Sequence, residues 1–185
     1  MELPRFRARL PRRTLPRALE GMASVQQAAR VIVFIVLSAL GAMVKIGSPL
    51  GVVTLADAPA YFAALCFGWV EGALVGGVGT LLSGLAASFP LGGLVHAYSA
   101  VQAALWATCL RLAYDRGGPV LALISTIFLA GVVSAALSWP LGGLALVTGS
   151  LVRLIASAAI NVLIATALFL VLTRSKVVYV RRRHY

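Results

Sequence analysis

Polar side chains interrupt the apolar runs of this sequence at helical spacing. An ionisable or amide group at membrane depth is costly, so by default it marks a ligand site or a transport pathway. Within each of three sets, the spacing places the members on one helix face. The sets are His96, Ser99, Gln102 and Trp106; Arg153, Ser157 and Asn161; and Asp57 with Tyr61, while Lys45 ends the first apolar run. We expect these side chains to converge on a pocket with apolar walls and few polar groups.

Each of these residues also has a structural explanation. Lys45 and Arg153 can extend to lipid headgroups, and Asp57 can cap its helix or neutralise one of these cations. His96 can simply begin a helix at the interface. Hydrogen bonding between helices explains Gln102 and Asn161 equally well, and Trp139 suits an interfacial anchor.

The composition is that of a membrane protein. Of the 185 residues, 61% are hydrophobic and 11% are charged, whereas soluble domains carry about 25% charged residues. Such a chain cannot cover a water-facing surface, and its length fits one compact membrane domain. Cys66 and Cys109 lie inside apolar runs without metal spacing, and we expect them to be small packing residues.

Six apolar runs predict helices, because unpaired backbone groups are too costly in lipid. The runs are 31–46, 57–70, 72–89, 94–114, 119–138 and 147–173. The second run is too short for a hydrocarbon core of about 30 Å, so neighbouring helices must bury it, or the loop before it must enter the membrane. In the third run, Gly72 and Gly76 form a GxxxG pair that favours close helix packing. Connections 47–56, 90–93 and 139–146 are rich in Gly, Pro and Ser and suit loops over a pocket.

The distribution of positive charge predicts the topology. All of the 16 Lys and Arg residues except Lys45 and Arg153 lie before the first run, beside the middle connection or after the last run. By the positive-inside rule, both termini are then cytoplasmic. The net charge of +11 is explained by anionic lipid rather than by nucleic acid.

We therefore expect an all-α integral membrane protein with six transmembrane helices. Residues 1–30 form a basic, partly disordered cytoplasmic segment, in which 19–30 can continue as an interfacial helix. Residues 31–173 form a six-helix substrate-binding domain, and 174–185 form a basic cytoplasmic tail.

Motifs for catalysis are missing from the sequence. There is no Gly-x-x-x-x-Gly-Lys-Ser/Thr loop for nucleotides, no His, Glu or Cys group with metal spacing, and no serine with a neighbouring His and acid. We expect a protein that is not an enzyme, with no catalytic residue, metal or cofactor of its own.

Three stretches carry a resemblance to a known family: 39–51 (ALGAMVKIGSPLG), 57–64 (DAPAYFAA) and 88–92 (SFPLG). They resemble the substrate-binding S component of energy-coupling factor (ECF) vitamin transporters, over roughly residues 31–114. Within that family, the nearest resemblance is to the branch assigned to α-ribazole, a precursor of the lower ligand of cobalamin.

The resemblance implies a prokaryotic plasma-membrane protein that captures a vitamin-like molecule from the outer side. Its partners would be a membrane coupling subunit and two cytoplasmic ATPase subunits, with Ser38 and Ala42 as the nearest match to the family's docking face. Asp57 suits ribose hydroxyls, and Tyr61, Trp106 or Trp139 suits stacking on a benzimidazole ring. The full set of expected substrate contacts is Lys45, Asp57, Tyr61, His96, Ser99, Gln102, Trp106, Trp139, Arg153 and Asn161.

Two functions of other classes compete with this hypothesis. In the first, the chain is a membrane scaffold or assembly protein, and the polar groups only hold helices together. In the second, it is a stand-alone facilitator or small channel for a solute.

Overall fold

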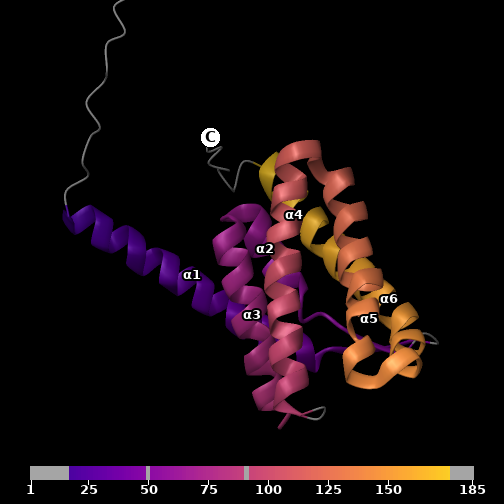
Figure 1. The fold of residues 1–185 in the computed structure, drawn as a ribbon. Coiled ribbons are helices and arrows are strands. Elements are labelled where there is room, and N and C mark those ends of the chain that lie inside the picture. Colours follow the sequence, from indigo (N-terminus) through magenta and orange to yellow (C-terminus); the bar gives the residue numbers. More distant parts are fainter. Residues whose placement is uncertain (1–16, 49–50, 90–91, 176–185) are drawn as a thin grey trace, which may run out of the picture.

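A computed structural model of the protein describes residues 17–48, 51–89 and 92–175. This part is mostly helical, with one short hairpin of strands (Figure 1). The elements are α1 (Arg17–Met43), β1 (Lys45–Ser48), β2 (Gly51–Thr54), α2 (Ala58–Cys66), α3 (Trp69–Ala86), α4 (Gly93–Ile127), η1 (Phe128–Val133), α5 (Ser134–Leu137) and α6 (Trp139–Arg174). The predicted disorder near the N-terminus and most of the predicted basic tail lie outside the described residues, as do 49–50 and 90–91 of the glycine-rich connections.

Four stretches of the described chain are long and apolar enough to cross a membrane. They are Ser24–Met43, Trp69–Ala86, Gly93–Leu137 and Trp139–Arg174. The prediction of a mostly helical chain with several membrane-length apolar helices is therefore confirmed. Helix α1 begins at Arg17, so residues 19–30 are helical, and their interfacial location stays a prediction.

The chain reverses direction inside α4. Gly118 has a φ of +72°, in the left-handed region that glycine adopts without steric cost. Pro119 follows, as is common in the first turn of a helix. Figure 1 shows the second part of α4, with η1 and α5, running back beside the first part. The predicted runs 94–114 and 119–138 thus correspond to two antiparallel segments. A similar break at Gly143, with a φ of +62°, precedes the long part of α6.

The expectation of an all-α fold is wrong in one place, where β1 and β2 form an antiparallel hairpin. Lys45 lies opposite Thr54, and Ser48 lies opposite Gly51. The β-branched residues of this short stretch, such as Val52 and Val53, favour extended backbone. Helix α1 already ends at Met43, so Lys45 belongs to a strand rather than to the first helix.

Helix α2 is short and buried, as the length of its run indicated. It has nine residues, and its buried side chains are Ala60, Tyr61, Ala63, Ala64 and Leu65. Gly68, with a φ of +136°, separates it from α3. A backbone turn of this kind favours glycine, which explains why the second run ends earlier than the sequence indicated.

Glycines of α3 allow three other helices to approach closely, as the small-residue spacing predicted. A Cβ atom on Gly76 would lie 2.8 Å from the carbonyl oxygen of Ala103 in α4, and one on Gly79 would lie 2.6 Å from Ser38 Oγ in α1. A Cβ on Gly72 would collide with α2. Close packing of this kind replaces the hydrophobic effect as the force between helices in lipid.

Candidate substrate-binding site

The backbone between β2 and α2, residues 54–58, is the centre of the polar contacts near the hairpin. We call it the 54–58 segment. Figure 1 shows the hairpin leaving the end of α1 and running toward the beginning of α6. The 54–58 segment brings the chain back from the hairpin into α2, and it contains Asp57, one of the predicted ligand contacts.

Asn161 of α6 binds both ends of the 54–58 segment. Its Oδ1 accepts a hydrogen bond of 2.8 Å from the Ala58 amide, and its Nδ2 donates to the carbonyl oxygens of Thr54 and Ser157, each at 2.8 Å. The side chain is fully buried. The structure thus gives Asn161 the hydrogen-bonding role between elements that was one of its two interpretations. Its role as a ligand contact stays a prediction.

Helix α1 holds the same segment from the other side. Ser38 Oγ donates a hydrogen bond of 2.5 Å to the Ala56 carbonyl, and the Leu55 amide donates one of 3.0 Å to the Gly41 carbonyl. A Cβ atom on Gly41 would lie only 2.5 Å from the Leu55 carbonyl oxygen, so this approach requires glycine. The 54–58 segment is clamped between α1 and α6.

Asp57 and Tyr61 lie beside this clamp without partners of their own. Asp57 is half-buried, and its carboxylate makes no hydrogen bond or ion pair with any residue that the structure describes. Tyr61, one turn later, is 2% exposed, and its hydroxyl likewise has no partner within the described ranges. Because no described residue engages the carboxylate or the hydroxyl, this pair is suited to accept hydrogen-bond donors from a bound solute.

The predicted polar stripe of α4 divides into two kinds of residue. Ser99 and Gln102 are half-buried, and neither side chain forms a hydrogen bond to the described part of the chain. Trp106, by contrast, is 9% exposed, and its Nε1 donates a hydrogen bond of 2.8 Å to Ser134 Oγ. Trp106 and Tyr61 belong to the buried core cluster, to which α2, α3, α4, η1 and α6 all contribute. Trp106 therefore ties the two antiparallel segments of the α4–α5 hairpin together.

His96 takes part in packing at the start of α4. Its Nδ1 lies 3.0 Å from the Gly92 carbonyl oxygen, and its ring meets the ring of Phe89 edge-on at 5.3 Å. A Cβ atom on Gly84 of α3 would lie 2.5 Å from the imidazole. These contacts match the interpretation of His96 as a residue that begins a helix.

The remaining predicted contacts are exposed. Lys45 and Arg153 are exposed, and Trp139 is 57% exposed at the start of α6. Over residues 17–48, 51–89 and 92–175, no hydrogen bond or ion pair joins Lys45, Asp57, His96 or Arg153 to another of these four. The part of Lys45, Trp139 and Arg153 in ligand binding stays a prediction.

The two predicted docking residues differ in their surroundings. Ser38 is 2% exposed and is enclosed between Gly79 of α3 and the Ala56 carbonyl. Ala42, one turn later on α1, is half-buried. In this structure Ser38 serves contacts inside the protein, and docking of a partner through Ser38 and Ala42 stays a prediction.

Sequence reasoning missed Ser134 and the π-helical turn η1 that precedes it. Ser134 is buried, and it accepts the hydrogen bond from Trp106. Within η1, Gly131 packs so closely on α6 that a Cβ would lie 2.8 Å from Ile155 Cγ1. Single π turns are frequent at functional sites. The only sequence feature that could have indicated this one was a glycine in the middle of an apolar run.

The described residues contain no group of three His, Cys, Asp or Glu side chains that could hold a metal ion. The groups that the site offers are a carboxylate, hydroxyls, an amide and aromatic rings. These groups recognise a solute by hydrogen bonding and stacking.

The fold is shared with a solved structure described as the S component of a bacterial ECF transporter. The superposition has a TM-score of 0.63 and 19% sequence identity, and it covers 86% of this chain and 99% of that chain. No protein-family model and no curated protein matches the sequence. At this level of identity the likeness establishes the fold, which is that of an S component.

Proposed function

We propose that this chain is the high-affinity substrate-binding subunit of an ATP-driven ECF-type importer for a vitamin or vitamin precursor. The proposal is supported by the fold shared with an S component and by the resemblance of 39–51, 57–64 and 88–92 to that family. Its partners would be a membrane coupling subunit and two cytoplasmic ATPase subunits. The chain itself would carry no catalytic activity.

The topology that we propose has six membrane helices and cytoplasmic termini. The reversal at Gly118 supports it, because it divides a stretch of 45 residues, which is too long for one crossing at about 1.5 Å per residue. The short α2, buried by its neighbours, would be the remaining helix. The arginines before and after the apolar helices support the orientation.

The substrate site that we propose is centred on Asp57. The observation that carries it is an unpaired, half-buried carboxylate next to an unpaired tyrosine hydroxyl, on a backbone that is fixed from both sides. Ser99 and Gln102 of α4 would supply further hydrogen bonds, since α2 and α4 pack together. The hairpin β1–β2 would cover the bound solute.

The ligand that we propose to test first is α-ribazole, because the stretches that carry the resemblance are nearest to that branch of the family. Its ribose hydroxyls would donate to Asp57, and its benzimidazole would stack on an aromatic ring. The test is thermal unfolding of the purified protein in detergent with a panel of vitamins. A tight ligand should raise the melting temperature, and native mass spectrometry of protein purified from cells would detect a co-purified ligand.

Thermal unfolding and a transport assay together separate the two competing functions. A scaffold protein would show no stabilisation by any member of the panel. A stand-alone facilitator would transport solute in reconstituted vesicles that lack the ATPase subunits. Stabilisation by a vitamin together with transport that requires the ATPase subunits would support the S component.

A further inference from the structure

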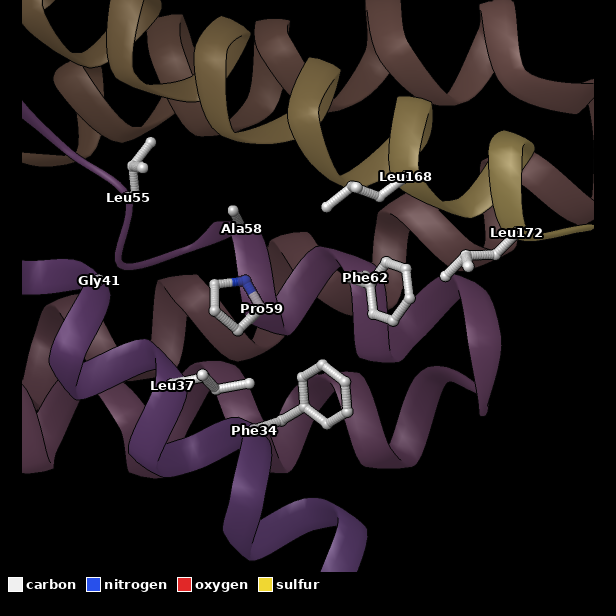
Figure 2. Close-up of a pocket in the computed structure, with 9 residues that line it drawn as sticks. All are labelled: Phe34, Leu37, Gly41, Leu55, Ala58, Pro59, Phe62, Leu168 and Leu172. Carbon is white, nitrogen blue, oxygen red and sulfur yellow. The ribbon is translucent and has the colours of Figure 1, made fainter. Parts of the chain in front are cut away.

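An apolar groove of about 330 Å³ lies between α1 and α6, on the side of the molecule where α2 forms its floor. Figure 2 shows Phe34, Leu37 and Gly41 of α1 on one wall, and Leu168 and Leu172 of α6 on the other. Leu55, Ala58, Pro59 and Phe62 complete its lining. Between Phe34 and Gly41 the groove follows α1 for about 10 Å, at 1.5 Å per residue. It therefore fits part of one extended hydrocarbon chain.

A row of aromatic rings connects this groove to an arginine. Phe62 stacks on Phe34 at 5.6 Å between ring centroids, and Phe34 meets Phe67 at 5.6 Å with its ring tilted by 66°. The guanidinium carbon of Arg30 lies 4.9 Å from the centroid of the Phe67 ring. Arg30 precedes Phe34 by one turn of α1 and is held near that end of the groove by a cation–π contact.

The guanidinium of Arg30 retains free hydrogen-bond donors. Its Nε donates to the Gln26 carbonyl at 3.3 Å, whereas no carboxylate of the described chain pairs with it. Glu71 of α3 instead accepts a hydrogen bond of 2.8 Å from Gln27. Arg30 is exposed, and α1 diverges from the other helices toward its N-terminus (Figure 1). The two Nη groups are therefore open to an anion, and this donor geometry matches a phosphate.

We propose that the groove between α1 and α6 holds one acyl chain of an anionic phospholipid whose phosphate is bound by Arg30. An acyl chain gains little hydrophobic energy on moving from the bilayer into a groove, because both surroundings are hydrocarbon. The preference for this lipid therefore comes from the charge of its headgroup. Arg174, exposed two residues beyond Leu172, adds a second cation at the end of the α6 wall. Basic groups between membrane helices on the cytoplasmic side are suited to such headgroups. This site rests on the orientation proposed above, but not on the proposed substrate or on transport.

The test is native mass spectrometry of the full chain in detergent, with equal amounts of phosphatidylglycerol and phosphatidylcholine carrying the same acyl chains. The wild type should retain phosphatidylglycerol in excess. Arg30→Gln should reduce that excess about fivefold, the effect of removing one cation beside an anionic headgroup. Arg30→Lys should retain most of the excess, because the charge remains. Arg116→Gln removes an exposed arginine of α4 that does not line the groove and should leave the excess unchanged.

A second variant tests the position of the acyl chain. Leu168→Trp places an indole in the groove and should lower the retention of both lipids. Equal losses in Arg30→Gln and Arg116→Gln would overturn the proposal, because the charge effect would then be nonspecific. Unchanged retention in Leu168→Trp would show that the lipid does not occupy the groove. A dimer that forms as lipid is lost would assign the groove to a second copy of this chain.

Discussion

Two neighbouring sets of polar groups differ in whether they have partners. In the clamp, Ser38, Gly41 and Asn161 satisfy the backbone of the 54–58 segment from both sides. Asp57 of the same segment and Tyr61, one turn later in α2, have no partner among the residues that the structure describes. Buried polar groups are normally paired, so the clamp contributes stability and the unpaired groups are available to a solute. Mutations in the two sets should separate these contributions.

The largest effect is expected for Asn161→Leu. The substitution leaves the half-buried Ala58 amide and Thr54 carbonyl without their partner, at up to about 1–3 kcal/mol each. We expect the free energy of unfolding, measured in mixed micelles by titration with a denaturing detergent, to fall by about 3 kcal/mol. Leu163→Ala changes an exposed residue of the same helix and should cost less than about 0.5 kcal/mol. Equal stability of the two variants would contradict the clamp.

Gly41→Val tests the other side of the clamp. Its side chain would collide with the Leu55 carbonyl, and overpacking of this kind costs about 1–3 kcal/mol. Gly149→Ala is the matched control, because a Cβ at that helical position meets nothing within 4 Å. The control should be neutral or more stable by about 0.5–1 kcal/mol. If Gly41→Val unfolds at the same denaturant concentration as the wild type, α1 does not hold the segment.

The smallest effect on stability and the clearest effect on binding are expected for Asp57→Ala. Because the carboxylate has no partner in the described chain, its loss should change the free energy of unfolding by less than about 0.5 kcal/mol. The affinity for α-ribazole, measured by calorimetry, should fall at least about tenfold if Asp57 binds it in a dry pocket. Asp115→Ala removes an exposed carboxylate that pairs with Arg111 and should leave affinity unchanged. Unchanged affinity in Asp57→Ala would show that Asp57 does not contact the ligand.

The helices of this fold were predictable because lipid restricts the backbone to few conformations. Long apolar runs without backbone partners must be helical, so the runs around α3 and α4 were located to within a few residues. Helix α6, however, begins at Trp139, inside the predicted connection 139–146. The short strands were missed because a four-residue strand has no length signal. Lys45 was assigned to a helix for that reason, although the β-branched residues at Val52 and Val53 favour strands.

The partners of polar side chains were not predictable from spacing. Helical periodicity placed His96 and Trp106 on the same face as Ser99 and Gln102, but it carried no information about Ser134 or Phe89. Those partners come from other segments of the chain. Their positions depend on the turn at η1 and on the turn after α3, where Ser88 and Phe89 have positive φ values. Asn161 shows the same limit, because its spacing fits a ligand contact and an interhelical bond equally well.

The π-helical turn at Phe128–Val133 changes the phase of its helix. Each inserted residue rotates the following side chains by about 100° relative to the preceding ones. Ala122 and Thr126, before the turn, are buried in the bundle, and Ser134, after it, meets the indole of Trp106. A regular helix of the same length would aim that hydroxyl along a different direction. The π turn thus lets the residues before it and the residues after it face neighbouring helices that lie in different directions.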